Sequence, residues 1–509
     1  MRFAWRSVGW LVKVVAATRP LLRGRHGVIA CGHPLAVSAG MEIFRRGGGA
    51  MDAALAAAGV LSVVLPDACG LGGDAMILAR QERGAVVAFN GSGAAPAMLD
   101  GVPQAHGASS AAVPGAVDCW EAAREQLGRL PMAELLQPAV DLARGGFPIG
   151  EALVTAIRNQ RGRLHRWAAG WEPLEAWVSP GALVRLPRLA HTLDRIGKEP
   201  RALYESELAE LIVASAGAAG GALGVADLAL HRTPQPSPVS DEFGRARIWV
   251  QPPVSQAVLA LMALRAVEET GWRGEADREH LSIEAIQAAF AYRDDVARPG
   301  AGNRLLRMPL VIDARRASKR GGPRGYTHTT AVATADEHGL VVSMLISIFD
   351  DFGCAVLVPE LGFLLNDRLL GFSAEAGSAN APVGGRKPVH TLAPCLVEAE
   401  WGTFALATPG ADGQVQSLVQ LLQALLGGEL GVPEAVEKPR WQVVRDRLRI
   451  ERGFEPAVAE ELEARGHQLE WQPWGNPALG AAVVAGLDNS QGTLFAAADR
   501  RREAWAAAW

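Results

Sequence analysis

Two apolar runs near the middle of the chain predict a β-hairpin, and a threonine stands directly before its first strand. Residues 330–335 read Thr-Ala-Val-Ala-Thr-Ala, and residues 340–348 are almost wholly apolar. Between them, the polar residues 336–339 end in glycine, which is typical of a turn. The alternation of small and β-branched residues fits a strand pair. The sequence therefore predicts a hairpin with Thr329 at its leading edge.

Thr329 is a candidate nucleophile because of this position. The glycine- and arginine-rich residues 316–325 precede the hairpin and are predicted to form an exposed linker. If the peptide bond after His328 is cut, Thr329 carries a free α-amine beside its hydroxyl, and that amine can act as the base. Threonine is also common in ordinary strands, so a plain strand residue is the alternative.

The composition is that of a globular protein with an ample core. The 509 residues are 49% hydrophobic and 20% charged, which suits two to four domains or one large α/β unit. A net charge of -4, with both signs interspersed, argues against nucleic acid or an anionic membrane as a partner. The five cysteines include no Cys-x-x-Cys pair, so neither a disulfide framework nor a zinc site is expected. We predict no metal and no other cofactor.

The first residues bear on localisation. Arg2 and Arg6 precede a short apolar stretch, residues 8–17, which Lys13 interrupts. Because no clean small-residue cleavage site follows, we expect a cytoplasmic protein; the periplasm is the alternative if residues 1–20 act as a signal. No run of eighteen or more apolar residues occurs, so no membrane span is predicted.

The rest of the pattern places strands at the start and in the last third of the chain, around a helical middle. The predicted strands are residues 28–31, 75–79, 86–90, 246–250, 390–396, 404–407, 443–450 and 481–485, and the predicted helices are 34–46, 50–65, 256–269, 282–296, 415–426 and 455–464. The glycine-rich residues 66–74 come before a strand, the wrong order for a phosphate-binding loop, so we expect tight backbone packing there. The turn at 407–414 opens a helix, and its backbone N–H groups can bind a developing oxyanion.

Several blocks in the same order resemble the γ-glutamyltranspeptidase family. They are Gly-Gly-Gly-Ala-Met-Asp-Ala-Ala at 47–54, Pro-x-Ala-x-Gly-Leu-Gly-Gly at 66–73, Ala-Val-Pro-Gly at 112–115, Gln-Pro-Ala at 137–139, Leu-Ala-Arg-Gly-Gly-Phe at 142–147, the stretch 325–353, Leu-Leu-Asn-Asp at 364–367 and Thr-Pro-Gly at 408–410. The resemblance implies an N-terminal-nucleophile hydrolase of the α+β class, a four-layer αββα sandwich made as a precursor that cuts itself.

The implied chain organisation follows from the cut. Residues 1–27 would be an N-terminal extension, residues 28–328 the large-subunit part and residues 329–509 the small-subunit part of one intertwined domain. The two fragments would stay associated, and a homo-oligomer is possible. Two registers exist for the cut, because Thr327 also precedes a candidate strand. Counting back from Gly339 without a gap places the family's Thr-Thr pair on Thr329-Thr330, so the resemblance favours Thr329, with cleavage after His328.

The resemblance also implies acyl transfer on a small-molecule amide. The Thr329 hydroxyl would attack the amide carbonyl, with its own α-amine moving the proton. The oxyanion would be bound by the backbone N–H groups of Gly410 and Ala411, where family members usually have two glycines. Ser347, eighteen residues after Thr329, stands where the family has a threonine that steadies the amine of the nucleophile.

The departures from the family concern the substrate. Its transpeptidases hold the γ-glutamyl group with an arginine, an asparagine, a serine pair and an aspartate. Here Ala94 stands at the arginine position and Phe349 at that of the asparagine. His390-Thr391 replaces the serine pair, and Gly371 replaces the aspartate. Without the charged arginine and aspartate, a zwitterionic γ-glutamyl group would bind more weakly. We therefore expect a substrate amide with a less polar acyl group. A true γ-glutamyltransferase with contacts supplied elsewhere and an inactive scaffold are the alternatives.

Overall fold

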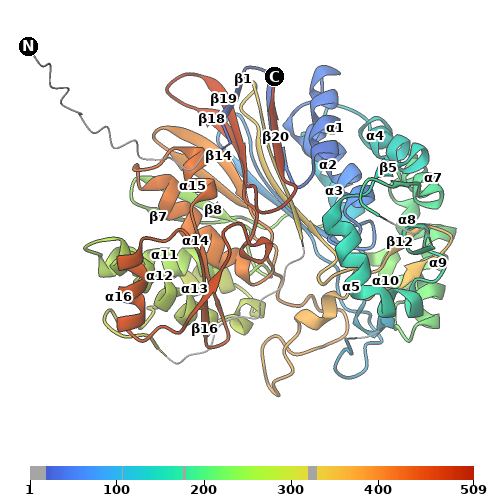
Figure 1. Ribbon diagram of the computed structural model, residues 1–509. Helices are drawn as coiled ribbons and strands as arrows, with labels where there is room; N and C mark the ends of the chain where they lie inside the picture. Colours follow the sequence, from blue (N-terminus) through green and yellow to red (C-terminus); the bar gives the residue numbers. More distant parts are fainter. Residues whose placement is uncertain (1–18, 106, 176–178, 319–328) are drawn as a thin grey trace, which may run out of the picture.

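The computed structural model describes residues 19–105, 107–175, 179–318 and 329–509. Two β-sheets lie face to face, and helices cover the outer face of each, so that the molecule has four layers (Figure 1). This is the αββα arrangement that the family resemblance implied. The predicted linker from residue 319 onward, with Thr327 and His328, and the candidate signal stretch before residue 19 lie outside the described residues. In the described part of the chain, no helix combines the length and apolarity needed to cross a membrane.

One sheet has the predicted hairpin at its centre. The strand order of this six-stranded antiparallel sheet is β20 (Trp505–Ala508), β2 (Gly27–Cys31), β9 (Thr330–Asp336), β10 (Val341–Ser347), β3 (Asp74–Arg80) and β4 (Val86–Gly91). Strands β9 and β10 form the hairpin, in which Val341 pairs with Ala335. All residues of both strands are buried, which agrees with their nearly continuous apolar character.

The second sheet combines strands from both ends of the chain. Its seven antiparallel strands are β1 (Leu22–Gly24), β19 (Thr493–Ala498), β18 (Val483–Asp488), β14 (Gly402–Ala407), β13 (Cys395–Ala399), β8 (Ala246–Val250) and β7 (Val239–Phe243). The layer between the sheets is rich in small residues such as Ala333 and Ala405, which let the two faces pack closely. Both sheets contain strands from before and after Thr329, so the two predicted parts are intertwined.

Helices pack on both outer faces. Helices α1 (Pro34–Arg45), α2 (Ala50–Val64) and α3 (Ala116–Leu127) share one buried apolar cluster with the six-stranded sheet. Helices α11 (Val258–Thr270), α12 (Glu275–Phe290) and α14 (Gly413–Leu426) share another with the seven-stranded sheet. Every residue of α2 is buried, because α1, α4 (Met132–Gly145) and β9 surround it.

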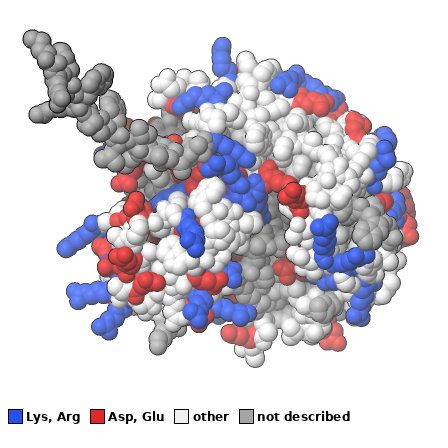
Figure 2. Space-filling view, in the orientation of Figure 1, with Lys and Arg blue, Asp and Glu red and all other residues white. Residues whose placement is uncertain are grey.

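The remaining elements lie outside the two large sheets and their covering helices. They are α5 (Glu151–Trp167), α6 (Glu172–Glu175), α7 (Pro187–Lys198), α8 (Ala202–Glu205), α9 (Glu207–Ala218), α10 (Val225–Leu230), α13 (Ala301–Leu306), α15 (Val432–Glu437), α16 (Pro456–Ala464), the short strands β5 (Phe147–Pro148), β6 (Leu183–Val184), β11 (Leu357–Val358), β12 (Phe363–Leu364), β15 (Trp441–Val444), β16 (Arg447–Glu451) and β17 (Leu469–Gln472), and the 3₁₀ turns η1 (Gly107–Ser110), η2 (Asp294–Ala297), η3 (Arg368–Gly371) and η4 (Pro477–Leu479). The face seen in Figure 2 has basic and acidic side chains interspersed among neutral residues.

Three predicted elements were wrong in extent. The strand expected at 390–396 begins only at Cys395, because Pro394 has no N–H to donate to a ladder. The strand expected at 443–450 is the pair β15 and β16, which turns at Arg445 with φ 57°. The helix expected at 282–296 is α12, which starts seven residues earlier and ends at Phe290.

Two glycines bring the site segments together. A Cβ on Gly72 would lie 2.1 Å from the carbonyl oxygen of Leu364, and one on Gly73 would lie 2.3 Å from that of Ser347. Only glycine permits this approach, so the predicted tight backbone packing of residues 66–74 is confirmed. As a result, the start of β3, the end of β10 and the segment after β12 meet at one place.

Candidate active site

Thr329 and Ser347 meet at one end of the central hairpin. Thr329 is 2% exposed, and its Oγ1 donates a hydrogen bond of 3.2 Å to the Oγ of Ser347. The same Ser347 oxygen accepts a hydrogen bond of 3.0 Å from the backbone N–H of Phe349. Arg502 donates from Nη1 to the Thr329 carbonyl oxygen at 3.4 Å. The structure thus brings together the two hydroxyls that the family resemblance paired.

The backbone is strained at both sides of this contact. Thr329 has φ 137° and Phe349 has φ 81°, and a β-branched residue at positive φ is a genuine outlier. Such conformations cost about 1–3 kcal/mol each and persist only where the surroundings impose them. The φ torsion of Thr329 includes the carbonyl carbon of residue 328. Cutting that peptide bond would therefore remove the constraint.

The proposed oxyanion donors lie in the turn between β14 and α14. Gly410 has φ 131° and Ala411 has φ 48°. Ala411, which stands where family members usually have a glycine, therefore adopts the left-handed backbone conformation that glycine favours. For an alanine this conformation costs about 1–2 kcal/mol. Within the described chain, the N–H groups of both residues have no hydrogen-bond acceptor. They lie at the N-terminal end of α14, where the helix dipole is positive.

A cavity of about 680 Å³ adjoins Thr329. Thr329 lines it together with Pro409 of the turn before α14, whereas Gly410 and Ala411 are not among the described residues that border it. Its other polar lining residues include Asp67, Glu151, Asn159, Asp351, Arg500, Arg501, Arg502 and Glu503. Burial lowers the pKa of Arg502 to about 10, so its guanidinium is still charged at neutral pH. Sequence reasoning assigned no role to these residues: Glu151 and Asn159 lie in a helix without a motif, and residues 500–503 follow β19. Asp67 and Asp351 lie in turns inside the blocks 66–73 and 325–353, where neither was singled out for the site.

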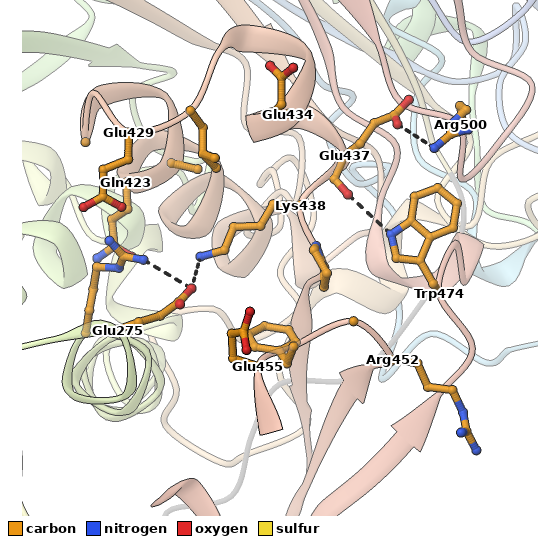
Figure 3. A pocket seen from close by; sticks show the side chains of 17 residues that line it. Glu275, Gln423, Glu429, Glu434, Glu437, Lys438, Arg452, Glu455, Trp474 and Arg500 are labelled. Carbon is orange, nitrogen blue, oxygen red and sulfur yellow. Dashed lines mark hydrogen bonds and ion pairs between the residues drawn. The ribbon is translucent and has the colours of Figure 1, made fainter. Parts of the chain in front are cut away.

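A second cavity, of about 730 Å³, is not bordered by Thr329. Figure 3 shows Lys438 pointing to Glu275 and Arg500 pointing to Glu437; the two nitrogen–oxygen distances are both 2.7 Å. Trp474 Nε1 donates to the carbonyl oxygen of Glu437 at 3.4 Å. Lys438 and Arg500 are thus each paired with a carboxylate of the same cavity. Among the lining residues only Arg500 also borders the cavity of Thr329.

The predicted substrate residues do not line the cavity of Thr329. His390 is fully buried, with Nε2 3.3 Å from Oδ2 of Asp74 and with Nδ1 accepting from the Leu392 N–H. Thr391 is buried beside it, and Phe349 is 6% exposed. Ala94 is half-buried, and its carbonyl oxygen accepts from the Val113 N–H. None of the four is among the residues bordering the cavity of Thr329 in the described structure.

Instead, His390 and Phe349 belong to a polar cluster built around Asp74 and Arg368. Arg368 Nε lies 2.6 Å from Oδ2 of Asp74, and its guanidinium carbon is 4.6 Å from the centre of the Phe349 ring. Burial alone would raise the pKa of Asp74, but Arg368 and His390 outweigh it and hold that pKa below its ordinary range. Burial lowers the pKa of His390 to about 4, so the imidazole is neutral at pH 7.

One group of possible metal ligands occurs among the described residues. His280, Glu284 and His467 are buried and place their ligand atoms within 4.8 Å of one another. His280 Nδ1 and His467 Nε2 are 2.8 Å apart, and His280 Nε2 is 2.8 Å from the carbonyl oxygen of Asp313. These are the contacts of a hydrogen-bonded pair, and they carry no metal assignment.

The model of the family described as gamma-glutamyltranspeptidase matches residues 36–509, nearly the whole chain. The chain belongs to this family. It is 30% identical to the oxamate amidohydrolase proenzyme of Klebsiella pneumoniae over 95% of this chain and 98% of that protein. It is 31% identical to the acylase ACY 1 proenzyme of a Pseudomonas species over 93% of this chain and 92% of that one.

The solved structures agree with this assignment. Cephalosporin acylase from Bacillus halodurans superposes with a TM-score of 0.87 at 27% identity, covering 99% of both chains. The αββα fold of the N-terminal-nucleophile hydrolases is therefore confirmed. So is the predicted class, a self-processing hydrolase or acyltransferase, because the relatives are amidohydrolase and acylase proenzymes.

Proposed function

We propose that Thr329 is the nucleophile of this enzyme and that its substrate is a small acyl amide other than a γ-glutamyl zwitterion. The observation that carries the proposal is the hydrogen bond between Thr329 and Ser347 at the border of a cavity. That bond orients the hydroxyl, and the strained φ of Thr329 supports cleavage of the peptide bond before it.

Maturation and catalysis use the same atoms. In the precursor, Oγ1 of Thr329 attacks the carbonyl carbon of residue 328, the C–N bond breaks, and an ester forms. Water hydrolyses this ester, which leaves a carboxylate on residue 328 and a free α-amine on Thr329. In turnover, that amine takes the hydroxyl proton as Oγ1 attacks the substrate amide, and it returns the proton to the leaving amine. Water then releases the acid.

The turn before α14 stabilises the charge that develops in both reactions. The N–H groups of Gly410 and Ala411 are held by the backbone and have no acceptor in the described chain, so they are available for a tetrahedral oxyanion. Loss of one such donor typically costs about 10²–10³-fold in kcat.

The substrate assignment rests on what the site lacks and on the relatives. The positions at which the transpeptidases bind the γ-glutamyl group are Ala94, Phe349, Gly371 and the His390-Thr391 pair. Ala94 has no charge, and His390 is engaged with Asp74. The oxamate amidohydrolase and acylase names of two relatives support cleavage of an amide with a different acyl group.

A denaturing gel and an anilide panel test the proposal. Purified wild-type protein should give two fragments and hydrolyse at least one acyl anilide faster than γ-glutamyl anilide. Thr329→Ala should remain one chain without activity. The matched control, Thr327→Ala, should process and turn over as the wild type does. An intact, inactive wild-type chain would contradict the proposal and favour the scaffold alternative.

A further inference from the structure

Helix α5 forms one wall of the cavity of Thr329. The α5 residues that border the cavity share one side of the helix, and they are Glu151, Ala152, Thr155, Ala156 and Asn159. At about 1.5 Å per residue, this wall is about 12 Å long. A substrate arm of several bonds therefore fits beside the helix.

Two carboxylates meet at the N-terminal end of this wall. Glu151 is the first residue of α5, and a Cβ on the preceding Gly150 would lie 2.5 Å from Oε1 of Glu503. Both glutamates border the cavity. Burial raises the pKa of Glu503, and the charge of Glu151 raises it further. In the described part of the chain, neither carboxylate has an arginine or lysine within ion-pair distance.

His33 is the neighbour of Glu503, but it brings no positive charge. Burial lowers the pKa of His33 to about 4, so its imidazole is neutral at pH 7. Nδ1 accepts a hydrogen bond from the Leu35 N–H, so the ring proton is on Nε2, which lies 3.8 Å from Oε2 of Glu503.

Two of the three arginines that border the cavity are balanced by carboxylates outside it. Arg500 lies 2.7 Å from Glu437, and Arg501 lies 2.6 Å from Glu451 and 3.0 Å from Asp499. With the arginine that also pairs with Asp499, at 2.7 Å, this group has three positive and three negative charges: Arg440, Arg500, Arg501, Glu437, Glu451 and Asp499.

The third arginine, Arg502, lies near the other two carboxylates of the cavity. Its Nε and Nη2 donate to the carbonyl oxygen of Pro477 at 3.1 Å and 2.9 Å, and Asp67 and Asp351 act on it electrostatically. Arg163 on α5 donates to the carbonyl oxygen of Asp351 and brings a second positive charge to this end of the cavity.

The charge that remains uncompensated is therefore that of Glu151 and Glu503. Asp350 and Asp367, which lie near Arg163, add no positive charge. Arg19 does not border the cavity, and it acts electrostatically on the group around Arg500. Two like charges beside a cavity favour a bound cation.

A buried hydroxyl at the cavity also lacks a partner. Thr330 borders the cavity and is 3% exposed, and its Oγ1 has no hydrogen-bond partner among the residues that the structure describes. This oxygen lies over Gly32, where a Cβ would be 2.1 Å from it. Leaving a buried hydroxyl unpaired is unfavourable, so a bound molecule with a polar group is favoured here. Thr330 follows Thr329 and Gly32 precedes His33, so the hydroxyl connects the two ends of the site.

We assign the cavity to the amine part of the substrate amide. The positions that the family resemblance assigns to the acyl group include Ala94, Phe349 and His390, and none of them borders the cavity in the described structure. The substrate arm that lies along α5 is therefore the one attached to the amide nitrogen.

We propose that Glu151 and Glu503 bind a positively charged group on the leaving amine, so that the enzyme hydrolyses amides of diamines and similar basic amines. This inference rests on the proposed function, because it names the amine that Thr329 releases. Water supplies the hydroxyl of the acid, and the amide nitrogen leaves with the proton from the α-amine of Thr329. The second, charged nitrogen of the amine is unchanged by the reaction.

Three acetamides that differ only in the end of the amine arm test the inference. They are N-acetylputrescine, which ends in an ammonium group, N-pentylacetamide, which ends in a methyl group, and 5-acetamidopentanoate, which ends in a carboxylate. Calorimetry on processed wild-type protein should show that N-acetylputrescine binds about 10-fold or more tightly than N-pentylacetamide. Because the carboxylates are partly exposed, added salt should reduce this preference. Equal binding of the three, binding of none, or tighter binding of 5-acetamidopentanoate would overturn the inference.

Variants of the two glutamates localise the preference. Glu151→Gln and Glu503→Gln keep the shape of the side chain and should each reduce the ratio of the two affinities, and Glu503→Lys should favour 5-acetamidopentanoate. The matched control is Glu400→Gln, at a side chain that is 84% exposed and outside the cavity. Its ratio should stay that of the wild type. An unchanged ratio in both glutamine variants would refute the assignment, and a loss of folded protein would not mimic the result because it affects both ligands equally.

Hydrolysis separates this inference from the proposed function. If an acyl anilide is hydrolysed, the three acetamides can be ranked as competitors of that reaction, and the order should be the same as in calorimetry. Hydrolysis of the anilide with equal competition would overturn the cation site and leave the proposed function intact. If no anilide is hydrolysed, the proposed function fails, whatever the calorimetric order.

Discussion

Replacement of Ser347 by alanine should slow both self-cleavage and turnover. The Ser347 Oγ accepts hydrogen bonds from Thr329 Oγ1 at 3.2 Å and from the Phe349 N–H at 3.0 Å. The Ser347 side chain is buried, and an alanine methyl group offers no acceptor in place of the lost hydroxyl. At about 1 kcal/mol for each bond, the loss is about 2 kcal/mol. If that stabilisation is present in the transition state, both rates fall by roughly 30-fold.

A time course of the precursor on a denaturing gel measures the first rate, and single-turnover hydrolysis by processed protein measures the second. Ser347→Thr is the matched control, because it keeps the hydroxyl at the position where the family has a threonine. It should retain most of both rates. Wild-type rates in Ser347→Ala would show that the hydroxyl contact does not orient the nucleophile, and the reasoning from this geometry would be refuted.

Three further predictions concern the backbone and the buried charges. Gly410→Ala should lower kcat and cost about 1–3 kcal/mol in the free energy of unfolding, because φ is 131° although the new Cβ meets nothing closer than 3.8 Å; urea unfolding and steady-state kinetics check this. Gly72→Ala should prevent soluble expression, since its Cβ would lie 2.1 Å from a backbone oxygen, and a soluble, processed variant would contradict the packing. The pKa of His390 is lowered to about 4 by burial, so on acidification its imidazole is protonated in the unfolded state at a higher pH than in the folded state. Stability should therefore fall as pH drops from 6.5 towards 4, and His390→Gln should flatten that slope in urea unfolding at pH 7 and pH 5.

The hairpin and the covering helices could be predicted because their signals are local. Small and β-branched residues at 330–335 and apolar residues at 340–348 flank a turn that ends in Gly339. This pattern by itself favours a hairpin, and tertiary packing adds to that preference. Asp336 then fixes the turn, with Oδ1 accepting from the His338 and Leu340 N–H groups. Its Oδ2 accepts from the Ala50 N–H at the start of α2.

The errors came from signals that are weak or were overlooked. Arg445 adopts φ 57° without being glycine or asparagine, so Asp446 is a weak signal for the turn between β15 and β16. The start of α12 was overlooked, although Glu275 and Asp277 are the acidic residues that favour a first helical turn.

The contact between Thr329 and Ser347 could be predicted, but the Asp74–Arg368 pair could not. Thr329 and Ser347 are eighteen residues apart in one hairpin, and the family pattern supplied their spacing. Asp74 and Arg368 are 294 residues apart, and a buried arginine is rare unless it is paired. Only the fold reveals that pairing, through the close approach of Gly72 to the segment after β12.

The most direct test of the central claim is the intact mass of the small fragment from purified wild-type protein. Cleavage before Thr329 predicts the mass of residues 329–509, with a free N-terminal threonine confirmed by sequencing from that end. A fragment that begins at residue 327, or a chain that stays whole, would contradict the assignment of Thr329 as the nucleophile.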